Sequence, residues 1–254
     1  MSEESLIAGR YRLLELLGAG GEAEVYRVRD ERDHTDVALR RPRQPHGEAS
    51  AVPALHFHPG WVRLLDSGFD PARGPFQIFE LLQGETLRQA VQRGPLDDAA
   101  WKKFITQSLD AVAALHDAGW VHGDLNADNF FHAGAAWKLL ELPFLRLAPP
   151  GPRSTIFGSI HSLSPEQLQG QPADTRSDLY ALGCLFYYAA TGEFPQAGQT
   201  RQEVVIGILR FPPAPLLEKS PGRDPRLAGW VMGLLEREPQ KRAASATEAR
   251  RLLE

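Results

Sequence analysis

A glycine-rich segment at residues 17–28, LGAGGEAEVYRV, is the first part of the chain whose residue types could do chemistry. Glycine has no Cβ, so backbone amides in such a segment can approach a phosphate closely, and loops of this kind bind nucleotides. The segment also lies between two strand-like runs, and a hairpin whose turn needs positive φ explains the same glycines. Taken alone, the pattern favours the hairpin and leaves nucleotide binding open.

The histidines and the cysteine of the chain give little support for a metal site or a disulfide. His46, His56 and His58 lie close in sequence, but no cysteine or carboxylate accompanies them at the spacing of metal ligands. The sequence therefore does not predict a metal site there. Cys184 is the only cysteine, so no disulfide can form within the chain.

The elements that must position functional residues begin with short strands. Between residues 11 and 80, five runs separated by glycine, proline or aspartate predict a small β-sheet; the runs are YRLLELL, EVYRVRD, DVALRR, WVRLLDSGFD and FQIFELL. Pro42, Pro45 and Pro53 interrupt the segment between Arg40 and His58, which leaves room for at most one short helix there.

Beyond the strands the spacing becomes helical. Between Asp97 and Gly119, large apolar residues recur every three or four positions, namely Trp101, Phe104, Ile105, Leu109, Val112 and Leu115. Asp97 or Asp98 can cap the start of this helix and Gly119 its end. A strand-rich first third followed by a helical remainder predicts an α+β fold with two lobes that join near residues 81–84.

Composition narrows the classes of function. The 254 residues carry a formal net charge of -4 and 24% charged residues, without the basic excess of a nucleic-acid-binding protein. The acidic start of the chain has no basic region before an apolar block, so it does not resemble a signal peptide. The most apolar stretch, 179–190, is too short to span a bilayer and suits a buried helix. We therefore expect a cytoplasmic protein that binds neither nucleic acid nor membrane.

Eight further motifs follow the glycine-rich segment along the chain. They are VALR at 37–40, HPGWVRLLD at 58–66, FELLQGETL at 79–87, HGDLNADNFF at 122–131, KLLELP at 138–143, GSIHSLSPEQ at 158–167, DLYALGCLFYYAATGEFP at 178–195 and EPQKRAASATE at 238–248. In these motifs and their order the chain resembles the protein-kinase superfamily, most of all bacterial serine/threonine kinases, from about Tyr11 to its end. The resemblance implies a bilobal protein-kinase-like fold, with a small antiparallel β-sheet N-lobe at 1–82 that has a shortened αC region, and a larger helical C-lobe at 83–254.

The resemblance also implies a site for ATP and magnesium. The positions that match nucleotide-contacting residues of the family are Gly18, Gly20, Val25, Ala38, Arg40, Glu80, Leu82 and Phe131. Ala23 replaces the third glycine of the family's loop. Glu22, at the tip of the loop, places a carboxylate where it would repel a triphosphate unless the loop turns it into solvent.

Arg40 stands where the family has the lysine that holds the α- and β-phosphates. A guanidinium keeps the charge but is a wide planar group, so the exchange alters a fitted site. Glu48 most nearly matches the αC glutamate that pairs with this lysine. Pro53 and the shortness of the segment leave little helix to position that glutamate.

The catalytic loop, HGDLNADNFF, keeps its main groups. The resemblance makes Asp124 the base that accepts the proton of the substrate hydroxyl, and Asn129 a ligand of the second magnesium. Gly123 replaces the arginine that docks a phosphorylated activation loop. Asn126 replaces the lysine that steadies the γ-phosphate, which removes a positive charge from the transition state.

The family's metal motif, Asp-Phe-Gly, is altered to Glu141-Leu142-Pro143. Glu141 and Asn129 are the implied metal ligands, but the extra methylene of glutamate moves its oxygens in a site that needs near-octahedral geometry. Pro143 fixes φ and removes an amide, so the movement of this segment should be restricted.

Phe131 stands where the family usually has a smaller aliphatic residue beneath the adenine. Its ring either fills part of the space of the base or lies flat as a larger floor, and the residue types leave both alternatives open.

The remaining matches concern the stability of the C-lobe and its regulation. Glu166, in the sequence SPE, and Arg242 match a buried pair of the family, and Asp178 matches the aspartate that holds the catalytic loop. Ser154 and Thr155 could be phosphorylated, but the arginine that usually receives the phosphate is missing.

Several altered groups act on one transition state, so their effects compound and the sequence predicts a pseudokinase that binds a protein partner. The alternative is an active ATP-dependent serine/threonine kinase with Asp124 as base, since positions 40 and 141 keep the sign of their charge. Phosphorylation of a small molecule ranks third, because the catalytic loop also resembles that of aminoglycoside and choline kinases. Adenylyl or glutamyl transfer stays open, and the sequence does not predict an oligomeric state.

Overall fold

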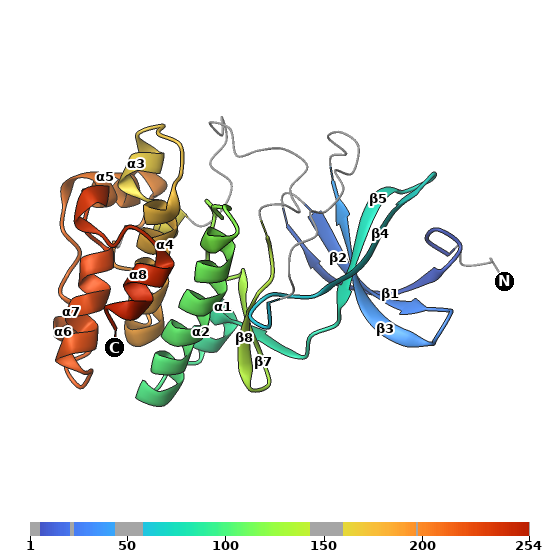
Figure 1. Ribbon diagram of the computed structural model, residues 1–254, viewed down its shortest axis with the longest axis horizontal. Helices are drawn as coiled ribbons and strands as arrows, with labels where there is room; N and C mark the ends of the chain where they lie inside the picture. Colours follow the sequence, from blue (N-terminus) through green and yellow to red (C-terminus); the bar gives the residue numbers. More distant parts are fainter. Residues whose placement is uncertain (1–5, 21–22, 44–57, 143–159, 197, 254) are drawn as a thin grey trace. The chain divides into compact units, whose positions relative to one another are not determined.

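The computed structural model of the chain describes residues 6–20, 23–43, 58–142, 160–196 and 198–253. These residues form two compact units (Figure 1). The first unit contains residues 6–20, 23–43 and 62–83, and the second contains the other described residues.

The first unit is a five-stranded antiparallel sheet with the strand order β1-β2-β3-β5-β4. Its strands are β1 (Tyr11–Ala19), β2 (Ala23–Asp30), β3 (Thr35–Pro42), β4 (Leu64–Asp70) and β5 (Gly74–Glu80). Each strand overlaps one of the five predicted runs, with ends that differ by up to three residues. A cluster of buried apolar side chains forms the core of this unit: Ile7, Tyr11, Val28, Val37, Leu39, Phe76 and Ile78. The predicted small antiparallel sheet is confirmed.

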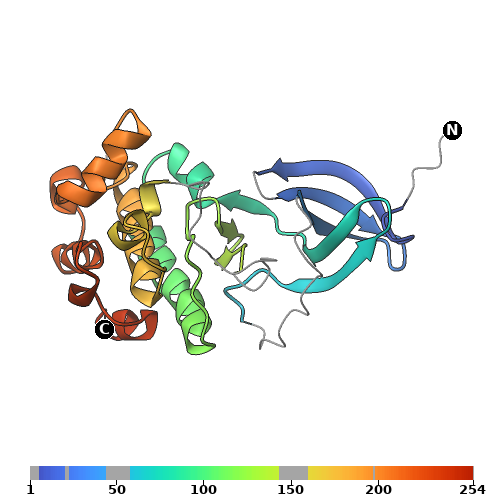
Figure 2. The ribbon, with the colours of Figure 1, turned by 90° about the horizontal axis from the view of Figure 1, so that it is seen from above.

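The sheet is twisted (Figure 2). A polar cluster connects its two edge strands, β1 and β4. The guanidinium of Arg10 donates to Asp30 at 2.5 Å and to Asp66 at 2.7 Å. The hydroxyl of Tyr11, on β1, donates to the same carboxylate of Asp66, on β4, at 2.8 Å. The hydrogen bond from Arg10 lowers the pKa of Asp30, so this buried carboxylate stays ionised.

The second unit begins with a small sheet and two helices. The sheet has the order β6-β7-β8, with β6 at Gly84–Thr86, β7 at Phe130–Ala133 and β8 at Ala136–Leu139; the helices are α1 (Leu87–Gln92) and α2 (Asp98–Asp117). The side chain of Asp97 accepts a hydrogen bond from the amide of Ala100 at 2.8 Å, and Gly119 follows the end of α2 with a φ of +81°. Both predicted caps of the long helix are therefore confirmed, and its six predicted apolar residues are buried.

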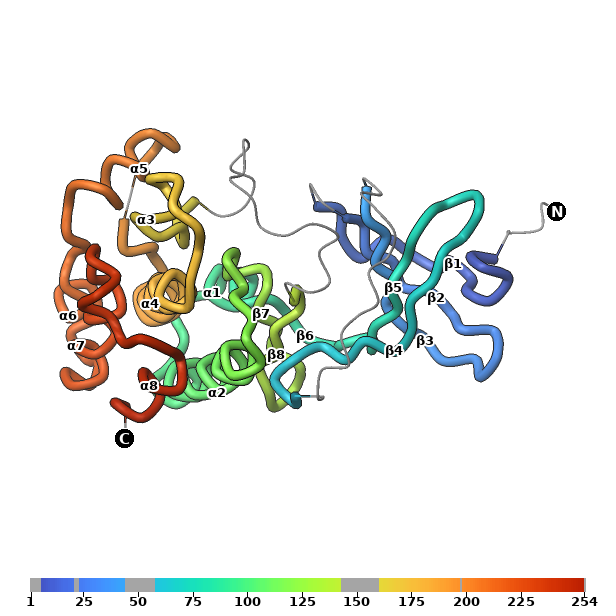
Figure 3. The backbone as a smooth tube through the Cα atoms, turned by 45° about the horizontal axis from the view of Figure 1, so that its top comes forward, coloured from blue at the N-terminus to red at the C-terminus, as the bar shows by residue number. Residues whose placement is uncertain are grey.

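The helix α4 (Thr175–Thr191) is the buried centre of the second unit. Every residue from Ser177 to Ala190 is buried, as the apolar stretch of the sequence predicted. Figure 3 shows α4 between α2 on one side and α6 (Leu216–Lys219) and α7 (Pro225–Leu234) on the other. The shorter elements around it are η2 (Ile160–Ser162), α3 (Pro165–Leu168), α5 (Arg201–Arg210), η3 (Pro239–Lys241) and α8 (Ala246–Arg251). None of the described helices combines the length and the apolar character needed to cross a membrane.

Candidate active site

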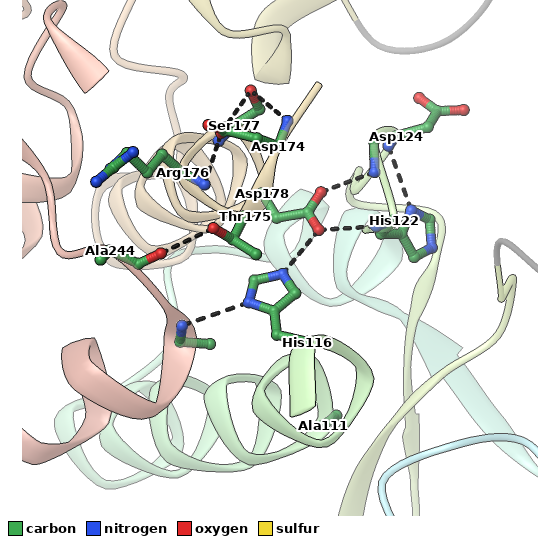
Figure 4. A network of polar contacts seen from close by, with 12 residues as sticks. Ala111, His116, His122, Asp124, Asp174, Thr175, Arg176, Ser177, Asp178 and Ala244 are labelled. Carbon is green, nitrogen blue, oxygen red and sulfur yellow. Dashed lines mark hydrogen bonds and ion pairs between the residues drawn. The ribbon is translucent and has the colours of Figure 1, made fainter. Parts of the chain in front are cut away.

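The catalytic loop of the second unit is anchored by Asp178, which is 1% exposed on α4. One carboxylate oxygen of Asp178 accepts a hydrogen bond from the amide of His122 at 2.8 Å, and the other accepts one from the amide of Gly123 at 2.7 Å (Figure 4). Asp178 thereby holds the backbone that leads into Asp124, the role that the resemblance implied. The ring of His116 also contacts this carboxylate, a partner that the sequence motifs did not indicate.

Two buried asparagines then hold the loop from within. The side-chain amides of Asn129 and Asn126 both donate to the carbonyl of Asp124, at 3.0 and 3.2 Å. The side-chain oxygen of Asn126 accepts from the amide of Asp128 at 2.9 Å. Asn126 therefore uses both ends of its side chain inside the loop, and it brings no positive charge to the surroundings of Asp124.

Gly123 has a left-handed backbone with φ +73°, a conformation that glycine adopts without strain. Its carbonyl accepts a hydrogen bond from the side chain of Gln167 at 2.9 Å, and its amide binds Asp178. Sequence reasoning identified only the loss of an arginine at this position. The structure adds that the local backbone favours the residue that is present.

Glu141 lies beside the same loop. Its carbonyl accepts a hydrogen bond from the ring of His122, and the amide of the preceding residue, Leu140, donates to the carbonyl of Asn129 at 2.8 Å. Leu142, which follows Glu141, is 4% exposed. The second unit thus brings the three implied catalytic and metal-binding residues, Asp124, Asn129 and Glu141, to adjoining backbone segments.

The donor types of these residues suit magnesium. The amide nitrogen of Asn129 is used by the loop, so its side-chain oxygen is the atom that could bind a cation, together with the carboxylate of Glu141. Among the described residues there is no group of three or more histidines, cysteines, aspartates or glutamates arranged to hold a metal. A magnesium ion at Glu141 and Asn129 would therefore need further oxygens from a nucleotide.

Five of the implied nucleotide-binding residues of the first unit lie on β1, β2 and β3 or, in the case of Gly20, directly after β1; they are Gly18, Gly20, Val25, Ala38 and Arg40. Gly18 and Gly20 do not have positive φ, and a Cβ built on either one meets nothing closer than 3.7 Å. β1 and β2 pair as an antiparallel hairpin, but positions 21 and 22, where its turn would need positive φ, lie outside the described residues, so the hairpin interpretation of these glycines stays a prediction. Gly18 lies opposite Val25 in the ladder between β1 and β2, and Val25 lies opposite Arg40 in the ladder between β2 and β3.

Arg40 is half-buried on β3. Its Nη1 donates to the side-chain oxygen of Gln77, the residue opposite it on β5, at 3.3 Å. Because side chains alternate along a strand, Arg40 and Ala38 lie on the face opposite to the buried Val37 and Leu39. The cation that replaces the family's lysine thus has a neutral amide beside it on the neighbouring strand.

Glu80 and Leu82 lie at and beyond the end of β5. The side chain of Glu80 accepts from the amide of Arg63 at 2.9 Å, and the amide of Glu80 donates to the carbonyl of Arg63 at 3.0 Å. Glu80 thereby connects the end of β5 to the chain just before β4. Leu82 is half-buried.

Phe131 lies on β7 opposite Thr86. Its ring packs against the backbone of Gly84, because a Cβ built on Gly84 would come within 3.1 Å of the ring and 1.9 Å of the carbonyl oxygen of His132. The approach to the backbone carbonyl of His132, together with a φ of +146°, explains why glycine is required at position 84. The two alternatives for Phe131 toward adenine stay predictions.

Apart from the histidines, seven residues named by the sequence analysis lie outside the described residues: Glu22, Pro45, Glu48, Pro53, Pro143, Ser154 and Thr155. The predicted shortened αC region and two of the three clustered histidines, His46 and His56, also lie there.

The pair that the resemblance implied between Glu166 and Arg242 is present. Arg242 donates to the two carboxylate oxygens of Glu166 at 2.8 and 3.0 Å, and both side chains are buried. The hydroxyl of Ser177 donates to the same carboxylate at 2.7 Å. Burial raises the pKa of Glu166, but the hydrogen bonds and charge of Arg242 outweigh it, so the pKa lies below its ordinary value.

Comparison with known proteins agrees with this geometry. The family model described as protein kinase domain matches residues 11–252. The serine/threonine-protein kinase PknB of Mycobacterium tuberculosis is 32% identical over 271 aligned positions, which cover 98% of this chain and 43% of the relative. The DNA damage-responsive serine/threonine-protein kinase RqkA of Deinococcus radiodurans is 34% identical over 265 positions, which cover 95% of this chain and 39% of that protein.

A solved structure shows the same fold. The crystal structure of Rad53 1-466 in complex with AMP-PNP superimposes with a TM-score of 0.82 and 22% identity, covering 96% of this chain and 64% of that one. The chain spans less than half the length of the two bacterial relatives. With a family match over nearly its whole length, this chain belongs to the protein kinase domain family.

Proposed function

We propose that this protein is a pseudokinase, a kinase-fold binding module with impaired phosphate transfer. The observation that carries the proposal is the state of Asn126. Its side chain is buried and bonded at both ends within the catalytic loop, where the family's lysine would supply a positive charge to the γ-phosphate. A transition state formed near Asp124 would lack that charge.

Other substitutions act in the same direction. Arg40 replaces the lysine that holds the α- and β-phosphates, and its neighbour on β5 is the neutral side chain of Gln77. Glu141 replaces the aspartate of the metal motif, Pro143 its glycine, and Ala23 the last glycine of the loop. Since these groups serve one transition state, their losses compound.

An active serine/threonine kinase is the second candidate. The anchoring of the loop by Asp178 favours it, because Asp124 and Asn129 keep a scaffold on which a base and a metal ligand could work. ATP and magnesium would then be the cofactors, with Glu141 and Asn129 as metal ligands. Phosphorylation of a small molecule is a weaker candidate, since the pair of Glu166 and Arg242 is typical of protein kinases.

We further propose that the protein acts in the cytoplasm through a protein partner, without binding nucleic acid or membrane. The ordinary content of charged residues and the net charge of -4 support the part of this proposal that excludes nucleic acid, and the altered phosphate-handling residues support a binding role with a protein. Capture of partners from the native cell with the purified chain, followed by identification of the bound proteins, tests it.

Two measurements decide between the main candidates. Thermal unfolding with ATP, with and without magnesium or manganese, should show little metal-dependent stabilisation if the protein is a pseudokinase. Phosphate transfer to a protein substrate is measured in parallel, with Asp124→Ala as the control. Clear metal-dependent stabilisation, together with transfer that disappears in Asp124→Ala, would establish the active kinase instead.

A further inference from the structure

A cavity of about 520 Å³ opens on the first unit, where β3 ends and β5 begins. Its lining contains three arginines, Arg41, Arg43 and Arg73, and a single acidic residue, Glu24, among the described residues. Successive side chains of a strand point to opposite faces, so Arg41 lies on the other face of β3 from Arg40. The cavity is therefore separate from the positions assigned above to ATP.

The strand register holds Arg41 firmly. Arg41 lies opposite Glu24 in the ladder between β2 and β3, and its Nη2 donates to the carboxylate of Glu24 at 2.6 Å. The same nitrogen donates to the hydroxyl of Tyr26 at 3.2 Å, and the guanidinium lies 5.4 Å from the centre of the Tyr26 ring. Such an anchored guanidinium loses little freedom when it binds a ligand.

Arg43 extends the same cationic surface. Its Nη2 lies 3.5 Å from the second oxygen of Glu24, and its side chain is 47% exposed. Arg41 and Arg43 both meet Glu24 through Nη2, and within the part of the chain that the structure describes their Nε and Nη1 have no hydrogen-bond partner. Two N–H edges are therefore available as donors to an anion.

The residues that line the cavity carry a net positive charge. The hydrogen bond from Arg41, followed by that from Tyr26, lowers the pKa of Glu24, so this acid is ionised and balances one of the three arginines. Asp70 lies near Arg73 and its oxygens accept the amides of Ala8, Ala72 and Arg73, but Asp70 is not one of the residues that line the cavity. The lining consequently carries two more positive than negative charges.

We propose that this cavity binds a phosphate monoester, with the guanidinium groups of Arg41 and Arg43 as its principal donors and Arg73 as a third positive charge. A phosphate monoester near neutral pH carries close to two negative charges and three acceptor oxygens, which match two forked guanidinium groups. The cavity is far larger than one phosphate, so it has room for the group that bears the phosphate. Pro42 and Pro75 provide apolar walls for that group.

The test measures binding directly. A fluorescent peptide with one phosphoserine and neutral flanking residues is titrated with the intact chain, beside the same peptide without phosphate. We expect saturable binding of the phosphorylated peptide alone. Arg43→Gln should weaken it about tenfold, since it removes hydrogen bonds to a charged group, and higher salt should weaken it further.

Arg32→Gln is the matched control. Arg32 is exposed in the turn before β3, at the other end of that strand from Arg43, and the exchange removes the same charge from the same unit. It should change the affinity by less than about twofold, because a distant exposed charge is screened. Urea unfolding of both variants verifies that the sheet is intact.

Competition separates the two sources of a phosphate. If inorganic phosphate or metal-free ATP displaces the peptide, and this displacement is lost in Arg43→Gln, the cavity is a site for small phosphates. If only phosphorylated peptides displace it, the ligand is a phosphoprotein partner. The proposal fails if no probe binds, if both peptides bind alike, or if Arg32→Gln weakens binding as much as Arg43→Gln. The proposal also fails if ATP binding depends on Arg40 and the binding of no probe depends on Arg43. That result would leave the proposed function, which concerns impaired phosphate transfer, unaffected.

Discussion

The ring nitrogen Nε2 of His116, at the end of α2, lies 3.0 Å from a carboxylate oxygen of Asp178 on α4, and the two side chains are 3% and 1% exposed. A carboxylate accepts hydrogen bonds, so Nε2 carries the proton, and Nδ1 is then the acceptor for the amide of Ala246 at 3.4 Å. Asp178 in turn accepts the amides of His122 and Gly123. One histidine thus connects α2, the start of α8 and the aspartate that anchors the catalytic loop.

Replacement of this histidine should weaken the anchor. His116→Leu leaves a buried carboxylate with one partner fewer and should lower the free energy of unfolding by about 1–3 kcal/mol. His116→Gln, whose side-chain amide can still donate to Asp178, should cost less. Urea unfolding measures the free energy, and hydrogen exchange reports whether the amide of His122 loses protection.

Lys103→Leu serves as the control, because Lys103 is exposed on the same helix, α2, and its replacement should change stability by less than about 0.5 kcal/mol. Equal losses for His116→Gln and His116→Leu, with unchanged protection at His122, would contradict the anchoring role.

Glu166→Gln should destabilise the second unit in a pH-dependent way. Removing the negative partner of buried Arg242 should cost about 3–5 kcal/mol near pH 7. The pKa of Glu166 is lowered in the folded state, so its contribution is complete above the ordinary value of 4.5 and is lost as the pH falls further. The difference between wild type and variant should therefore shrink below about pH 4.5 in urea unfolding at a series of pH values.

Glu238→Gln is the control for this series, since Glu238 is 65% exposed and forms only a surface pair with Lys241. A gap between wild type and Glu166→Gln that stays constant down to pH 3 would show that the ionised pair is not the cause.

Gly123→Ala should cost about 1–2 kcal/mol of stability, because a non-glycine residue is strained at positive φ. The nearest atom to the new Cβ is 3.5 Å away, so the cost reflects the backbone and not a clash. Gly123→Asn should cost less than Gly123→Ala, since asparagine tolerates this conformation better. Gly222→Ala, at a glycine without positive φ and with open space around it, should be nearly neutral in the same thermal or urea unfolding. Equal effects at both positions would refute the explanation.

Restoring family residues should improve nucleotide binding if altered geometry is the defect. The triple variant Arg40→Lys, Glu141→Asp and Pro143→Gly should show a larger metal-dependent thermal stabilisation by ATP than wild type. Asn126→Lys, added to this variant, should raise phosphate transfer, because it returns a cation to the loop. Unchanged stabilisation in the triple variant would argue against this account of the defect.

The order of motifs was enough to predict the fold, and the family match over residues 11–252 confirms it. Predictions of helix caps and of buried helix faces were accurate, because both depend on residues that are close in sequence. Asp97 and Gly119 cap α2 as predicted, and the apolar stretch in α4 is buried, because caps and periodicity involve residues a few positions apart. The implied catalytic residues Asp124 and Asn129 were identified by type, and the structure adds the bonds that join them.

The sequence by itself therefore determined the class of fold. It also determined which residues of the candidate site differ from those of the kinase family. Only the tertiary structure decided that Asn126 turns into the loop, that Gly123 needs a left-handed backbone, and that Arg41, Arg43 and Arg73 line one cavity. The physical reason is that side-chain partners and backbone angles depend on strand register and on packing between distant segments. Neither can be deduced from the spacing of residue types along the chain.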